Sequence, residues 1–141
     1  MTIGERVRVE RLALGLSVAA LAHEAGCSET MLKHCENGKS FPNAAKLGAI
    51  AKALGVSADY IVFGESVPLG KRHTKPCTGL YRRLKKERED RELTLSALGE
   101  QARISYVTLS NWETNKCYPN ILTLADVAKA LGVTLEYLIF G

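Results

Sequence analysis

The residue types most often used in catalysis and metal binding are present, but their spacing suits neither chemistry. The chain has four cysteines and no C-x-x-C pair among them: Cys27, Cys35, Cys77 and Cys117. A zinc site could be imagined from His23, His34 and two of these thiols, but the spacings match no known ligand pattern. The neighbouring His34 and Cys35 would point about 100° apart on a helix, and we find no catalytic triad, phosphate loop or carboxylate pair. We therefore expect free thiols, no metal, no cofactor and no enzymatic activity.

The overall composition is that of an ordinary globular protein with a weak basic balance. Hydrophobic residues make up 46% of the chain, charged residues 24%, and the net charge is +4. This balance permits nucleic-acid binding without requiring it. The N-terminus has no apolar run of the signal-peptide kind, and no stretch approaches about 18 consecutive apolar residues. We expect a cytoplasmic protein with no membrane partner, and the sequence indicates no small-molecule ligand.

An internal duplication organises the chain. A shift of 77 positions aligns residues 3–64 with residues 80–141 without a gap, and 23 of the 62 aligned pairs are identical. The longest identical stretch, AKALGV, begins at Ala51 and again at Ala128. Because each copy should be one structural unit, we predict unit 1 over residues 1–64, a basic Pro/Gly-containing linker over 65–79 and unit 2 over 80–141.

Helix-capping residues precede short apolar-periodic runs and divide each unit into five predicted helices. Thr2 and Glu5 have the capping-box spacing, and the other predicted caps are Ser17, Ser28, Asn43 and Ser57 in unit 1 and Thr94, Ser105, Asn120 and Thr134 in unit 2. Helices this short need tertiary packing for stability. We expect a core built from Val7, Leu14, Leu21, Leu32, Leu47, Ile50, Leu54 and Ile61, and in unit 2 from Leu84, Leu98, Leu109, Leu124, Val127, Leu131 and Leu138. The predicted fold class is all-α, with two tandem five-helix domains.

In each unit a tight turn joins the second and third predicted helices. In unit 1 the turn is Ala25-Gly26-Cys27, and the third helix extends from Ser28 to about Glu36; unit 2 repeats this segment between Thr94 and Lys116. Two short helices joined by such a turn are typical of the helix-turn-helix motif, whose second helix enters the DNA major groove.

Both units resemble helix-turn-helix domains of the lambda-repressor/Cro type, also called the XRE family, over nearly the whole chain outside the linker. The matching residues in unit 1 are Arg11, Leu16-Ser17, Leu21-Ala22, Ala25 to Ser28, Glu36 to Lys39, Pro42 and Ala51 to Val56. In unit 2 they are Arg88, Leu93-Thr94, Leu98, Ala102, Ser105, Trp112-Glu113, Lys116, Pro119 and Ala128 to Val133. The resemblance implies a lambda-repressor-like fold and a transcriptional regulator, by expectation a repressor, that binds double-stranded DNA by sequence.

The resemblance also implies roles for individual residues. Structural ion pairs should join Arg11 to Glu36 and Arg88 to Glu113. Base-reading side chains should lie on the third helix of each unit: Glu29, Thr30, Lys33 and His34, and Tyr106, Val107, Ser110 and Asn111. Phosphate contacts should come from the following loop, through its N–H groups and one Lys per unit: Asn37, Gly38, Lys39 and Ser40, and Asn115, Lys116 and Tyr118. By groove chemistry, Asn111 suits adenine, Lys33 guanine, Glu29 cytosine and Val107 the thymine methyl group.

The chain departs from the family pattern in three places. Val18 and Leu95 stand where family members often carry a phosphate-binding Gln. Arg103 replaces the turn glycine, and a left-handed non-Gly residue costs about 1 kcal/mol, so either the turn differs or Arg103 is tolerated for a phosphate contact. Glu29 is repelled by phosphate yet favoured by the helix dipole, which leaves open a variant in which unit 2 reads DNA and unit 1 binds another chain.

The two third helices, SETMLKH and SYVTLSN, differ at every outward position, so the units should read different half-sites. If the linker is a flexible tether, its typical span is about 20 Å and its limit about 50 Å, which allows half-sites about 34 Å apart. Homodimerisation would multiply the half-sites, and the sequence leaves it open. The alternative function is a protein-interaction or antitoxin-like module, in which one domain binds DNA and the other a protein partner.

Overall fold

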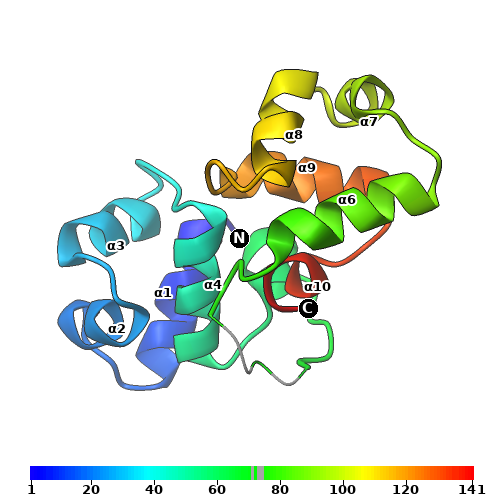
Figure 1. Ribbon diagram of the computed structural model, residues 1–141. Helices are drawn as coiled ribbons and strands as arrows, with labels where there is room; N and C mark the ends of the chain where they lie inside the picture. Colours follow the sequence, from blue (N-terminus) through cyan, green and yellow to red (C-terminus); the bar gives the residue numbers. More distant parts are fainter. Residues whose placement is uncertain (71, 73–74) are drawn as a thin grey trace.

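The computed structural model describes residues 1–70, 72 and 75–141. Lys71, His73 and Thr74 of the predicted linker lie outside the described residues. Within the described chain the regular secondary structure is ten α-helices in two groups of five (Figure 1). The all-α prediction is confirmed. The helices are α1 (Ile3–Ala13), α2 (Val18–Ala25), α3 (Glu29–Glu36), α4 (Ala44–Leu54), α5 (Ala58–Phe63), α6 (Leu80–Asp90), α7 (Leu95–Ala102), α8 (Tyr106–Glu113), α9 (Ile121–Leu131) and α10 (Leu135–Phe140).

Side-chain caps begin these helices at the predicted residues. The Ser28 hydroxyl accepts from the Met31 N–H at 3.0 Å at the start of α3, and the Asn43 amide oxygen accepts from the Lys46 N–H at 2.8 Å at the start of α4. Each cap satisfies one of the first-turn N–H groups that have no partner within the helix. Among the described helices α6 differs, because it begins after Gly79 without a side-chain cap.

The predicted apolar faces meet in the core, with one exception. Fourteen of the fifteen side chains predicted for the core are buried, among them Leu32 and Leu109 on the inner faces of α3 and α8. The prediction for Leu14 is wrong, because this side chain is 54% exposed. Helix α1 ends at Ala13, and Leu14 follows as its C-cap, just before Gly15 turns the chain with a φ of 69°. Leu14 therefore lies beyond the helical periodicity that suggested its burial.

The turn between the second and third helices has the same conformation in both units, although its sequence differs. Gly26 ends α2 with a φ of 66°, and Arg103 ends α7 with a φ of 60°. The next N–H donates back to the helix in both cases, from Cys27 to Ala22 O and from Ile104 to Gly99 O. Of the two outcomes that the sequence allowed for Arg103, a different turn is therefore ruled out.

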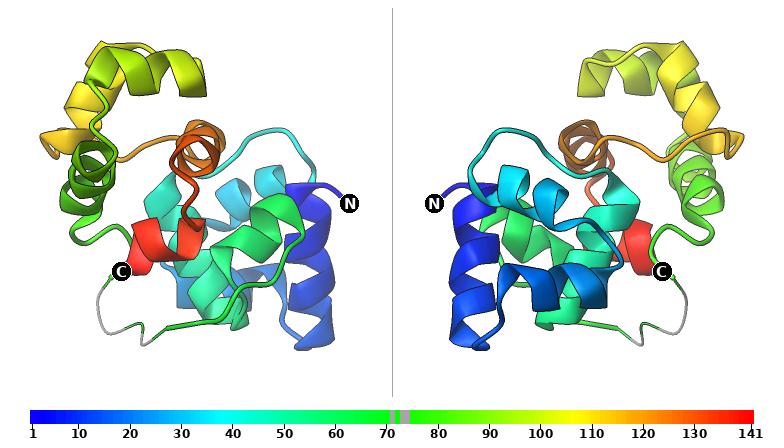
Figure 2. Two further views of the ribbon diagram at one scale, coloured as in Figure 1. Left: turned by 90° about the vertical axis from the view of Figure 1, so that its right-hand side faces the viewer. Right: turned by 90° about the vertical axis from the view of Figure 1, so that its left-hand side faces the viewer.

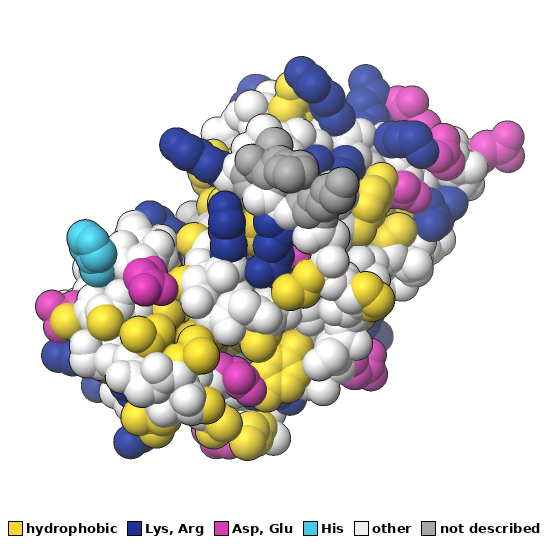
Figure 3. All heavy atoms as spheres, turned by 90° about the horizontal axis from the view of Figure 1, so that it is seen from below, with side chains coloured by type: hydrophobic (Ala, Val, Ile, Leu, Met, Phe, Trp, Pro, Cys, Tyr) yellow, Lys and Arg dark blue, Asp and Glu magenta, His cyan; other side chains and the backbone are white. Residues whose placement is uncertain are grey.

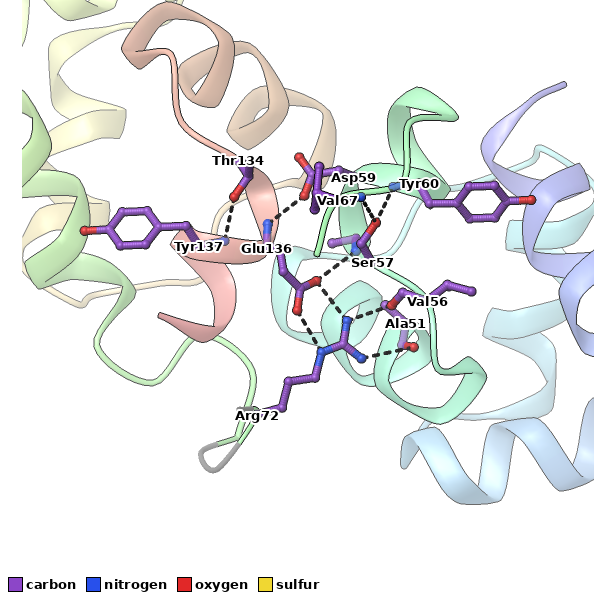
Figure 4. Close-up of polar contacts among 11 residues, drawn as sticks. Ala51, Val56, Ser57, Asp59, Tyr60, Val67, Arg72, Thr134, Glu136 and Tyr137 are labelled. Carbon is purple, nitrogen blue, oxygen red and sulfur yellow. Dashed lines mark hydrogen bonds and ion pairs between the residues drawn. The ribbon is translucent and has the colours of Figure 1, made fainter. Parts of the chain in front are cut away.

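The two units pack against each other through their C-terminal helices. Helix α10 contacts α4 and α5 of unit 1, and α4 also contacts α9 (Figures 1 and 2). Figure 4 shows the polar centre of this contact, where Arg72 of the linker binds Glu136 of α10 at 2.7 Å. The linker residue Cys77 is buried and donates its N–H to Ile139 O at 2.8 Å. At Arg72 and Cys77 the linker is thus part of the packed structure and not a free tether.

We predict that Arg103→Gly raises the free energy of unfolding by about 1 kcal/mol, because glycine adopts the left-handed conformation without a Cβ penalty. Urea denaturation followed by circular dichroism measures the change. The matched variant Gly26→Ala places a Cβ in the same turn of unit 1 and should lower stability by a similar amount. Destabilisation by Arg103→Gly would mean that the arginine makes contacts that outweigh its backbone strain.

Candidate nucleic-acid interface

An ion pair joins the third helix of each unit to the first. In unit 1, Arg11 Nε and Nη2 each donate to a Glu36 carboxylate oxygen at 2.9 Å. In unit 2, Arg88 makes the same two bonds to Glu113 at 2.8 Å. All four side chains are at most 13% exposed. A bidentate pair of this kind sets the angle as well as the distance between the two helices.

Each arginine of these pairs also holds the beginning of the second helix. Arg11 Nη1 donates to Leu16 O at 2.8 Å, and Arg88 Nη1 donates to Leu93 O at 2.7 Å. Both carbonyls lie immediately before the caps of α2 and α7. The bond to Glu113 raises the pKa of Arg88, so the guanidinium stays charged. One guanidinium therefore positions both helices of each helix-turn-helix segment.

The outward face of α3 carries charged and polar groups. The four side chains proposed to read bases there, Glu29, Thr30, Lys33 and His34, are all exposed. Leu32 and Cys35 on the same helix are fully buried. Because the helix packs on the core through Leu32 and Cys35, its opposite face makes no core contacts. That face could enter a DNA major groove, which is wide enough to admit an α-helix.

The outward face of α8 has a different chemistry. Tyr106 and Val107 are 58% and 52% exposed, while Ser110 and Asn111 are half-buried. None of these four side chains carries a charge at neutral pH. The outward face of α3 is thus charged, whereas that of α8 has no charged residue and carries aromatic and aliphatic groups.

The loop after each third helix exposes its residues, but most of its N–H groups bond back to the helix. The residues proposed as phosphate contacts, Asn37, Gly38, Lys39 and Ser40 and then Asn115, Lys116 and Tyr118, are all exposed. The Lys39 N–H, however, donates to His34 O at 2.9 Å, and the Lys116 N–H donates to Asn111 O at 2.9 Å. The expectation of free loop N–H donors is therefore wrong at these positions, because the last carbonyls of α3 and α8 take them. Phosphate binding would rest on side chains.

The segments that follow α3 and α8 meet at the contact between the units, where Asn43 and Asn120 form an antiparallel bridge. In Figure 1 α3 lies at the left and α8 at the top, and α10 lies at the contact between the units.

Two of the thiols, Cys35 and Cys77, are buried, whereas Cys117 is exposed in the loop after α8. Burial raises the pKa of Cys35 to about 11 and that of Cys77 to about 12, so both stay protonated and unreactive at neutral pH. All four cysteines are free. Within the described part of the chain no three His, Cys, Asp or Glu side chains are grouped so as to hold a metal ion, and no described helix has the length and hydropathy to cross a membrane.

A groove with three lysines lies at the junction of the units. Lys46, Lys52 and Lys75 line it, and Figure 3, which views the molecule from below, shows Lys and Arg side chains gathered beside the linker. The Lys46 ammonium donates to Gly26 O at 2.8 Å and so holds the turn that precedes α3. This groove is lined by α2, α4 and the linker, and also by Tyr118, one of the proposed phosphate contacts.

Three residues that join the units, Asp59, Glu136 and Arg72, were not predicted from the sequence. The two acids are 4% and 5% exposed, and burial raises the pKa of Asp59. Their signal was present, since both stand at the same repeat position in the first turn of a short helix. An acid there is also what the helix dipole alone favours, so the pattern did not distinguish a surface residue from an inter-unit contact.

Comparisons with known proteins identify both halves of the chain. Residues 2–60 match the family described as "Helix-turn-helix domain", and residues 84–138 match the family described as "Helix-turn-helix". The transcriptional activator BcrR of Enterococcus faecalis is 36% identical over 59 residues, which cover 42% of this chain and 29% of that protein. Repressor protein C2 of Salmonella phage P22 is 36% identical over 63 residues, which cover 45% of this chain and 29% of that protein.

A solved structure is also similar in part. The crystal structure of the P22 c2 repressor protein in complex with a synthetic operator has 35% sequence identity and a TM-score of 0.45, covering 46% of this chain and 98% of that one. The chain thus matches less than a third of the length of the two curated relatives.

We predict that Arg88→Ala lowers the free energy of unfolding by about 3 kcal/mol, because the Glu113 carboxylate stays buried without its partner. The double variant Arg88→Met/Glu113→Leu removes both charges and should recover most of this loss. The exposed Lys85→Ala on the same helix serves as the control in urea denaturation. A loss for Arg88→Ala no larger than that of the control would show that the pair does not hold α8 in place.

Proposed function

The chain belongs to the helix-turn-helix family through both of its halves, and from this premise we propose that it binds double-stranded DNA by sequence and regulates transcription. The helices α3 and α8 would enter the major groove, and the loops that follow them would contact phosphates. The observation that carries this proposal is the pair of third helices, each held by a buried ion pair and each with an outward face that is exposed or half-buried.

The side chains of α3 and α8 support direct reading of bases. Lys33 and His34 can donate to guanine or adenine acceptors, and Asn111 can bond adenine through both amide atoms. Val107 offers an apolar contact for a thymine methyl group. Because the two faces differ in charge and shape, the two halves of the DNA site would have different sequences.

We further propose that the chain represses transcription, since two domains seated in the groove would exclude other proteins from the same DNA. Both signs of regulation occur among the names of the relatives, an activator and a repressor. A reporter gene placed behind the selected site tests the sign, and increased transcription would contradict repression.

Selection from a random duplex library tests DNA binding by the intact chain at near-physiological salt. We expect a composite site with one half lost in an α3 variant, Thr30→Ala/Lys33→Ala, and the other half lost in an α8 variant, Ser110→Ala/Asn111→Ala. If the α3 variant selected the same site as the unchanged chain, unit 1 would not read bases and would be free for a protein partner. No enriched site at all would contradict the proposed function.

We predict that Asn111→Ala lowers affinity for the selected site by about 1–3 kcal/mol and relaxes sequence preference at one base pair. Competition binding against duplexes with single base changes measures both effects. Exposed Glu100→Ala, on α7, is the control. An unchanged preference at every base pair would remove Asn111 from the reading set.

We predict that Lys116→Ala weakens binding to all duplexes alike and reduces the slope of log affinity against log salt concentration by about 1, because one phosphate contact is lost. Titrations at several salt concentrations measure this slope. Lys85→Ala removes an equal charge from α6 and should leave the slope nearly unchanged. A loss confined to the selected sequence would assign Lys116 to base reading.

A further inference from the structure

The polar contacts between the units are reciprocal. Asp59 Oδ1 accepts from the Leu135 N–H and its Oδ2 from the Glu136 N–H, both at 2.9 Å, at the start of α10. Glu136 Oε1 in turn accepts from the Ala58 N–H at 3.1 Å, at the start of α5. Asp59 and Glu136 occupy the same repeat position, as do Ala58 and Leu135. Each unit thus provides an acid that accepts from the first turn of the last helix of the other unit. The two acids stand at equivalent positions of the repeat.

A second contact pairs a repeat position with itself. Asn43 and Asn120 stand at the same place in the two units and form an antiparallel bridge, with the Ala44 N–H donating to Pro119 O at 2.9 Å. A residue meets its own counterpart only where a two-fold axis passes between the copies. The units are therefore related by an approximate two-fold rotation, not by a translation along the chain.

Arg72 is the linker residue that binds both units in this arrangement. The Arg72 guanidinium binds both Glu136 oxygens at 2.7 and 2.8 Å, donates to Val56 O at 2.7 Å and lies over the Phe140 ring at 4.5 Å. Gly48 of α4 leaves room for the linker and α10, because a Cβ there would lie 2.7 Å from Pro76 and 2.8 Å from Ile139. The relative position of the units is thus set by packed groups and not by linker length.

We infer that one chain is a complete pseudo-dimer, which reads two different half-sites in inverted orientation at a single spacing. This inference rests on the proposed function. A two-fold rotation turns α8 opposite to α3 along the duplex, so its half-site is read in the opposite direction. A homodimer with this geometry reads a palindrome, whereas unlike faces on α3 and α8 give an operator with a defined left and right end.

Amide hydrogen exchange tests the docking without DNA. Ala58, Leu135 and Glu136 lie in the first turns of their helices, where N–H groups have no intrahelical partner. Their amides should exchange at least about tenfold more slowly than that of Glu29, the exposed first residue of α3, because their acceptors are carboxylates of the other unit. Equal exchange at these positions would overturn the docked arrangement, whatever the DNA measurements show.

Designed duplexes test the operator. The two selected half-sites are placed at the selected spacing, then about 5 base pairs further apart, which is half a helical turn, and then as a direct repeat. We expect the second and third duplexes to bind at least about tenfold more weakly than the first, with one chain per duplex in sedimentation. Equal affinity for all three would overturn the fixed geometry while leaving DNA binding intact; absence of any selected site would overturn both proposals.

Two variants are designed to separate the docked units, so that the spacing test does not depend on one set of substitutions. Asp59→Ala/Arg72→Ala/Glu136→Ala removes the reciprocal caps together with the linker cation, and Gly48→Leu wedges α4 away from the linker and α10. Each variant should bind the duplex with the longer spacing with an affinity within about twofold of its affinity for the duplex with the selected spacing. Each should also keep its preference for the two half-site sequences. Exposed Asp126→Ala on α9 is the control and should keep the spacing preference. A variant that loses protection at Leu135 but keeps strict spacing would contradict the inference.

Discussion

The N–H groups in the first turn of every helix need hydrogen-bond acceptors from outside the helix, and most of this structure depends on how they are supplied. The described helices have between six and eleven residues, so a large share of their N–H groups lie in first turns without an intrahelical acceptor. Ser, Thr and Asn caps satisfy some of these groups within each unit, as at Ser28 and Asn43. Asp59 and Glu136 satisfy others across the contact between units. One physical requirement thus shapes both the helices and their assembly.

The same shortness makes the third helices depend on tertiary contacts for their position. Helices of eight residues are not stable in isolation, and α3 and α8 are held by a buried leucine on the inner face and by a bidentate ion pair at the C-terminal end. The outward side chains of α3 and α8 are therefore not needed to hold these helices in place. Duplication could therefore change every outward residue of the helix while the arginine, the glutamate and the leucine stayed the same.

The two copies differ on the outward faces of α3 and α8 and at positions where the copies meet. Gly48 corresponds to Ala125, and the space above Gly48 is used by Pro76 and Ile139. Arg72 has no counterpart in the repeat, since it belongs to the linker, and it neutralises a carboxylate that would otherwise be buried beside α5. The linker thus makes an otherwise symmetric contact specific to this order of the two units.

The sequence by itself determined the helices, their caps, the division into two copies and the resemblance to lambda-repressor-type domains, which the family matches confirm. These features are local or repeated, so periodicity and residue type are enough to find them. It did not show that Leu14 lies outside the core, that the loop N–H groups bond to the ends of α3 and α8, or that the linker is packed. Those outcomes, and the two-fold relation of the units through Asp59 and Glu136, were decided only by the tertiary structure. An acid in the first turn of a helix reads the same in sequence whether it faces water or a second domain, and only the packing of distant segments distinguishes the two.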